Sequence, residues 1–122
     1  MERIETSARL ALIEQAGLAV ATLVESLSQD ELLRSRLTRA EVMRQLRTLV
    51  ASATGVAPAV RETMPELDWN GWAALGQQLA QPPGEALDEA LWFACSALVP
   101  ATLLWLRVYR QAQPTLFRMG AG

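Results

Sequence analysis

Apolar and small residues recur at helical spacing through the first part of the chain. Between about residues 2 and 27 they alternate by three and four positions: Leu10, Ile13, Gly17, Val20, Val24 and Leu27. This spacing lines one side of a helix with residues that pack against another helix. Residues 28–30 interrupt the pattern, and the polar stretch 30–37 is long enough to hold a helical turn.

A second helix is predicted to start at Thr38, because Thr38 and Glu41 have the spacing of a capping box. One apolar face follows: Val42, Leu46, Leu49, Ala53 and Val56. Arginines occupy mostly the opposite side. Gly55 and Pro58 weaken the pattern near its end, so the helix is expected to kink there or to continue after a bend.

Asp68 is the expected N-cap of a third, shorter helix over residues 69–80. Trp69 and Trp72 lie three positions apart and share a face with Gly76. Tryptophans with this spacing favour core anchors over a ligand platform. The strongest turn pattern in the chain follows at residues 81–84, where two prolines precede a glycine.

The last predicted helix spans about residues 85–110 and is uncharged from 90 to 106. Glu85 and Glu89 lie in its first turns and Arg107 and Arg110 in its last, which complements the helix dipole. The uncharged run reaches the lower limit of a membrane span. A buried central helix is favoured instead, because Pro100 interrupts the run and the other helices offer amphipathic faces to cover it.

These elements predict an all-α fold, an antiparallel bundle of four to five helices. Residues 1–112 form one domain and residues 113–122 a loose tail from which Phe117 docks back. A helix that is apolar nearly all round needs cover on every side. Dimerisation through the last helix, or through the helix that carries the two tryptophans, is therefore expected.

Composition restricts the chemistry. The 122 residues include no histidine, the usual acid–base group near neutral pH and the commonest metal ligand. Cys95 stands alone in an apolar run and is expected to be a buried small hydrophobe. No carboxylates have paired-acid or metal-ligand spacing, so no catalytic residue, metal or cofactor is expected.

The net charge of the chain restricts its binding partners, and the sequence of its amino terminus indicates its cellular location. All eleven basic residues are arginines, and the net charge is −2. A net negative charge does not predict a basic surface for nucleic acid, so DNA is not expected as a partner and RNA is disfavoured. The amino terminus mixes both signs of charge and lacks the basic region of a signal peptide, which predicts a cytoplasmic protein without a membrane role.

Residues 37–106 resemble the HepT-like branch of the HEPN superfamily, helical proteins encoded beside a minimal nucleotidyltransferase. Residues 37–53 are similar to that family's second helix and residues 60–69 to its proline–acid–aliphatic–x–tryptophan junction. The closing helix is similar too, with Trp92 ahead of a Leu98–Val99–Pro100 step. The resemblance implies a helical bundle, a homodimer and a nucleotidyltransferase partner.

The resemblance also implies a ribonuclease motif of arginine, histidine and tyrosine after the junction. Aligned from Trp69, this chain has Gly76 at the arginine position, Gln81 at the histidine position and Pro83 at the tyrosine position. Cleavage of RNA needs a group that takes a proton from a 2′-hydroxyl and a cation that stabilises the phosphorane. Neither Gly76 nor Gln81 supplies one, and Pro83 has no hydroxyl to accept a nucleotide.

The leading hypothesis is therefore a catalytically inactive HepT-like protein that acts through protein–protein interaction. One alternative is a nucleotide or small-ligand module built on Trp69, Trp72 and nearby arginines. Another is a residual RNA-acting toxin–antitoxin component or phosphoryl enzyme. In that alternative the cationic group is Arg44, Arg47 or Arg61. These tryptophans and arginines are the candidate interface or ligand contacts.

Overall fold

The computed structural model describes the backbone of residues 2–118 and the side chains from residue 4 onward; residues 119–122 of the predicted tail lie outside the described residues. The described part is helical and holds no strand, which confirms the all-α prediction. The helices are α1 (Glu2–Val24), α2 (Gln29–Arg34), α3 (Arg36–Thr54), α4 (Pro58–Glu62), α5 (Trp69–Leu79), α6 (Glu85–Phe93) and α7 (Val99–Ala112). A π-helical turn, η1 (Ala94–Leu98), joins α6 to α7, and a short 3₁₀ turn, η2 (Pro114–Leu116), follows α7. These are more helical segments than the four to five expected.

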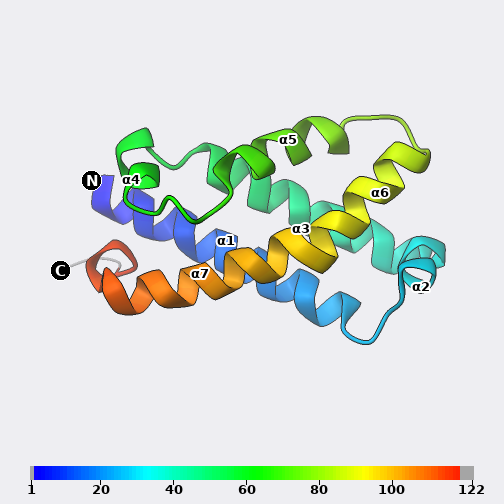
Figure 1. Ribbon diagram of the computed structural model, residues 1–122, viewed down its shortest axis with the longest axis horizontal. Coiled ribbons are helices and arrows are strands. Elements are labelled where there is room, and N and C mark those ends of the chain that lie inside the picture. Colours follow the sequence, from blue (N-terminus) through cyan, green and yellow to red (C-terminus); the bar gives the residue numbers. More distant parts are fainter. Residues whose placement is uncertain (1, 119–122) are drawn as a thin grey trace.

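The long helices pack side by side as a helical bundle. α1 lies along α3 and α7, and α3 also packs against α5. α6, η1 and α7 form one continuous helical rod, called the last rod below, and α5 packs against its first half. In Figure 1, α1 and α3 run in opposite directions, as do α5 and the last rod, while α2 and α4 lie at opposite ends of the molecule.

One core runs through the bundle and takes side chains from every long helix. The largest fully buried side chains are those of Trp72, Leu10, Ile13, Leu32, Leu46, Leu49, Met64, Leu75, Leu91 and Leu106. Burying one such side chain stabilises the fold by about 1.5–3 kcal/mol. α1 and α7 approach closely at Gly17, where an added Cβ would lie 3.0 Å from Leu103 Cδ2.

The capping box predicted at Thr38 is wrong. α3 begins at Arg36, which places Thr38 inside the helix. The capping box lies earlier, at α2: Glu31 N donates to Ser28 Oγ at 3.1 Å, and Ser28 N donates to Glu31 Oε1 at 2.9 Å. α1 also ends earlier than expected, at Val24, because Ser26 takes a left-handed backbone conformation (φ 69°).

Two other expected helix boundaries are confirmed. Asp68 caps α5, since Gly71 N donates to Asp68 Oδ1 at 2.8 Å. α3 ends at Thr54, and the chain restarts as α4 with Pro58 in its first turn. A proline suits that position because the first helical N–H groups have no partner within the helix.

Pro100 does not break the last rod. A proline lacks the N–H of an α-helical bond and its ring crowds the preceding turn. Just before it the helix widens into η1, where Val99 N donates to Ala94 O five positions earlier. Two hydroxyls cap nearby carbonyl groups: Ser96 Oγ donates to Trp92 O at 2.7 Å and Thr102 Oγ1 to Leu98 O at 2.8 Å.

The described part of the tail folds back onto the bundle. Ser7 Oγ is within hydrogen-bond distance of Leu116 O (2.9 Å) and of Arg118 O (2.8 Å). The Arg110 guanidinium lies 4.8 Å from the centre of the Phe117 ring. Phe117 therefore closes the end of the bundle between α1 and α7.

Two helices are long and apolar enough to cross a membrane by length and composition, over residues Ile4–Val24 and Glu85–Ala112. Core helices of soluble proteins have the same composition. Each supplies one face to the core, and only 33% and 39% of the two segments, respectively, is buried. The remaining faces of these two helices are open in the single chain.

Candidate functional site

The positions that correspond to the ribonuclease motif gather where α3, α5 and α6 meet. Gly76 lies near the end of α5, and Gln81 and Pro83 lie in the loop that leads to α6. One hollow of about 420 Å³ opens there, lined by Arg39, Met43, Arg47, Leu79, Gln81, Pro83, Gly84, Leu87 and Asp88. A second of about 280 Å³ is lined by Arg47, Val50, Ala51, Gly76, Leu79 and Ala80. Arg47 and Leu79 line both, so the two hollows form one surface, called the α3–α5–α6 corner below.

The charges at this corner come from two arginines and one carboxylate. Arg39 Nη2 contacts Asp88 Oδ1 at 2.5 Å, and these side chains are 22% and 33% exposed. Arg47 makes no ion pair with any described residue. The corner therefore offers one cation to an anion, while its carboxylate is already engaged.

Gly76 has a packing role that the sequence did not reveal. A Cβ added there would lie 2.8 Å from Val50 Cγ1 on α3. Real side chains do not come so close, and valine is stiff about χ1, so Val50 would have to move. α5 therefore approaches α3 closely at Gly76.

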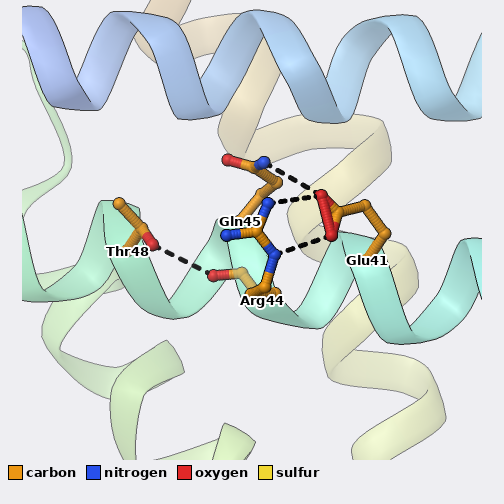
Figure 2. Close-up of polar contacts among 4 residues, drawn as sticks. All are labelled: Glu41, Arg44, Gln45 and Thr48. Atoms are coloured by element: carbon orange, nitrogen blue, oxygen red, sulfur yellow. Dashed lines mark hydrogen bonds and ion pairs between the residues drawn. The ribbon is translucent and has the colours of Figure 1, made fainter.

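Arg44 belongs to a separate, exposed cluster, drawn in Figure 2. Its Nε and Nη2 donate to the two oxygens of Glu41 at 2.7 and 2.6 Å, and Gln45 Nε2 donates to Glu41 Oε2 at 3.1 Å. These bonds, from Arg44 first and then Gln45, lower the pKa of Glu41 to about 2. The same pairing raises the pKa of Arg44. Arg44 does not line the corner that Arg47 lines.

Arg61 and Trp69 lie together at the opposite end of α5. They line an open hollow of about 500 Å³, with Pro58, Glu62, Pro65, Glu66, Leu67, Asp68 and Asn70. Trp69 Nε1 donates to Met64 O at 2.9 Å, which fixes the loop before α5. Arg61 Nε is buried and has no hydrogen-bond partner among the described residues.

Trp72 is separate from this hollow. It is 2% exposed, and its Nε1 donates to Thr102 Oγ1 at 3.0 Å across the core. The prediction of a core anchor is confirmed for Trp72. Trp69 is half-buried and clamps a loop, so the two tryptophans do not form a shared platform.

The sequence predicted dimerisation through the last helix, but it did not indicate which residues would be exposed. Large apolar side chains project from the last rod and from α1. Phe93, Leu104 and Val108 are 52%, 54% and 42% exposed, and Ile4, Leu12 and Leu18 are 48%, 44% and 53% exposed. The uncharged run 90–106 indicated that the last helix would carry an apolar surface. Which of its residues face outward depends on how the helix packs against α1 and α5.

The described residues hold no group of three or more His, Cys, Asp or Glu side chains that could bind a metal. Cys95 is buried in the core. Burial raises the pKa of its thiol to about 11. A thiol in this state is neither a nucleophile nor a metal ligand near neutral pH.

No protein-family model, curated protein or solved structure matches this chain. The resemblance to HepT-like proteins therefore rests on the residues of this chain alone. The three positions that the resemblance aligns with the ribonuclease motif share one surface with Arg47. Trp69, from which they were aligned, lies at the far end of the same helix.

Proposed function

We propose that this chain is a catalytically silent HepT-like protein that works by binding other proteins. Its partner is a second copy, a minimal nucleotidyltransferase, or both. The observation that carries the proposal is the row of large apolar side chains exposed on two long helices, at 42–54%. Water-exposed apolar surface of this extent favours association, because covering it is driven by the hydrophobic effect.

The absence of catalysis follows from the chemistry of the α3–α5–α6 corner. Arg47 is the cation there that makes no ion pair with a described residue, and the carboxylate that lines the corner, Asp88, is bound to Arg39. Gln81 exchanges no proton near neutral pH, and Pro83 has no hydroxyl. A 2′-hydroxyl placed at this corner would meet no general base.

The junction before α5 supports the family resemblance because its residues hold the bundle together. Met64 and Leu67 are 0% and 3% exposed, and Glu66 N donates to the Tyr109 hydroxyl at 3.2 Å. Asp68 caps α5 and Trp69 binds Met64 O. The family-like features therefore have scaffold roles, as expected if the scaffold was kept and the chemistry lost. We further propose that the long rods form an antiparallel bundle of the HepT type.

The proposed setting is the cytoplasm, without a membrane. The two apolar helices pack against α3 and α5, and the open face of the last rod has Glu89 and Arg107 at its two ends. A protein of this kind is expected to purify without detergent. Loss from solution when detergent is withheld would contradict this part of the proposal.

The function is tested by co-expressing the chain with a minimal nucleotidyltransferase. We expect a defined complex with that enzyme, a homodimer, or both on size-exclusion chromatography with light scattering. Labelled RNA incubated with the pure protein should remain intact at the rate of a buffer control. A monomer that leaves the nucleotidyltransferase unbound would overturn the proposal, as would RNA cleavage that Arg47→Ala abolishes.

A second candidate function is small-ligand binding in the hollow between α4 and α5. The partnerless Arg61 Nε beside the Trp69 ring favours it. Three carboxylates on the rim, Glu62, Glu66 and Asp68, weigh against a phosphate group because they repel it. A nucleotide at 100 times its Kd would stabilise the fold by about 2.7 kcal/mol. A thermal shift that Arg61→Gln removes would establish this site, and unchanged melting across a nucleotide panel would eliminate it.

A further inference from the structure

The outward surface of the last rod is apolar at its middle and charged at both ends. We define the outer face of the last rod as its exposed positions Glu89, Phe93, Ser96, Ala97, Pro100, Ala101, Leu104, Arg107 and Val108. Each turn of the rod contributes at least one of them. Ser96, Ala97, Pro100 and Ala101 are small residues, flanked by Phe93 and Leu104, which are 52% and 54% exposed.

This face is complementary to the same face of a second rod that runs in the opposite direction. Phe93 and Leu104 lie equally far along the chain from the Leu98–Val99 peptide bond, and so do Ser96 and Ala101. Glu89 and Val108 also lie equally far from this peptide bond, and Val108 directly follows Arg107 in the chain. A two-fold axis at that peptide bond would therefore set Phe93 against Leu104 of the partner subunit and small residues against small ones. Val108 would fall opposite Glu89 of the partner subunit at the end of the contact, where Glu89 also comes near Arg107 of the partner subunit.

We propose that a second copy of this chain covers the outer face of the last rod, with the two rods antiparallel. This inference rests on the proposed function and names its partner surface. Phe93 packs on Leu104 of the partner subunit, and Glu89 pairs with Arg107 of the partner subunit. The small residues between them let the rods come within the 8–10 Å typical of packed helices. A two-fold contact of this kind repeats every interaction twice.

The other exposed apolar surface, on α1, does not suit the same pairing. Its large residues are Ile4, Leu12 and Leu18. An antiparallel pair of α1 helices centred on Gln15 would bring Glu5 against Glu25 of the partner subunit. Both carboxylates are exposed, Glu25 follows the end of α1, and Glu5 is already paired with Arg9 of its own helix. This pairing therefore brings no acid against an unpaired base and lacks the charge complementarity of the last rod.

The test compares two leucines with nearly equal exposure. Leu104 is 54% exposed on the last rod and Leu18 is 53% exposed on α1, so Leu104→Glu and Leu18→Glu are matched variants. On sedimentation equilibrium we expect the wild type and Leu18→Glu to be dimeric and Leu104→Glu to be monomeric. Circular dichroism verifies that each variant is folded. A dimer that survives Leu104→Glu but dissociates with Leu18→Glu would overturn the inference and leave the proposed function standing.

A charge swap tests the direction of the rods. Glu89→Arg and Arg107→Glu should each weaken the dimer by roughly 3- to 10-fold, since each replaces two exposed pairs by two repulsions. The double variant should recover wild-type affinity, because the opposite charges face each other again. Failure of the double variant to recover would exclude this antiparallel register.

A membrane surface is the competing occupant of this face. Vesicles of zwitterionic lipid, with and without anionic lipid, are mixed with the wild type and with Leu104→Glu. We expect no co-sedimentation of the wild-type dimer with either kind. A wild type that is monomeric without lipid and binds vesicles through Leu104 would overturn both the dimer and the cytoplasmic setting.

Discussion

Trp72 and Thr102 link α5 to the last rod inside the core. The indole N–H donates to Thr102 Oγ1, and the same hydroxyl donates to Leu98 O at the π-helical turn. The spacing of the tryptophans predicted a core anchor, and Trp72 is one. The sequence did not show that Trp69 would bind Met64 O instead, because that contact depends on the path of the loop between α4 and α5.

Cys95 gives a prediction at this scale. Because burial raises its pKa to about 11, the thiol should react with a thiol reagent at pH 8 far more slowly than in a denatured control. The raised pKa also means that folding favours the protonated thiol. Its contribution to stability is complete below the ordinary pKa of 9.0 and is lost as the pH rises toward 11. Rapid labelling of the native protein would show that the residue is accessible.

Gly76 gives a second prediction. Gly76→Arg should destabilise the fold by about 1–3 kcal/mol, because the new Cβ meets Val50 Cγ1. Urea unfolding measures this loss. In a double-mutant cycle with Val50→Ala, the two changes should cost less together than the sum of their separate costs. Additive costs would show that α5 does not press on Val50.

At the scale of the elements, the sequence predicted most helices but placed some of their ends wrongly. Asp68 was identifiable because it directly precedes an apolar pattern. Thr38 and Glu41 had the right spacing for a cap, yet Glu41 binds Arg44 and Gln45 instead (Figure 2). The π-helical turn was not predictable from periodicity, since it depends on how Pro100 is accommodated against the core.

The capping box at Ser28 can be compared directly with the wrongly predicted one at Thr38. Ser28→Ala should destabilise the protein by about 0.5–2 kcal/mol, because it removes the acceptor of the Glu31 N–H. Thr38→Ala, inside α3, should change the free energy of unfolding by less than about 0.5 kcal/mol. Chemical denaturation of both variants measures the difference. Equal losses would mean that Thr38 is a cap after all.

This cap also depends on pH. Hydrogen bonds from the Ser28 backbone and then its side chain lower the pKa of Glu31 below its ordinary 4.5. A lowered carboxyl pKa stabilises the folded state above the ordinary value, and that contribution is lost as the pH falls below it. The stability gap between the wild type and Ser28→Ala should therefore narrow below about pH 4.5.

The candidate site was predictable only in part. The alignment from Trp69 identified Gly76, Gln81 and Pro83. Their common surface with Arg47 was not predictable, because it requires α3 and α5 to pack in one register. The Arg39–Asp88 ion pair was not predictable either, because the two residues are far apart in the chain and no sequence pattern connects them.

At the scale of the whole molecule, two helices have more apolar surface than one small bundle can cover. The sequence predicted this excess, because the last helix is uncharged from residue 90 to 106. The packing determines which side remains open: Leu91, Leu98 and Leu106 turn inward, while Phe93 and Leu104 remain exposed. Association is the expected consequence of this open apolar surface.

The molar mass of the purified chain over a range of concentrations tests the central claim most directly. Light scattering after size exclusion should give about twice the chain mass of 13.4 kDa, with dissociation only on dilution. Addition of a minimal nucleotidyltransferase should produce either a larger complex or an unchanged dimer. A mass of 13.4 kDa at every concentration, with and without that enzyme, would contradict a role in protein–protein interaction.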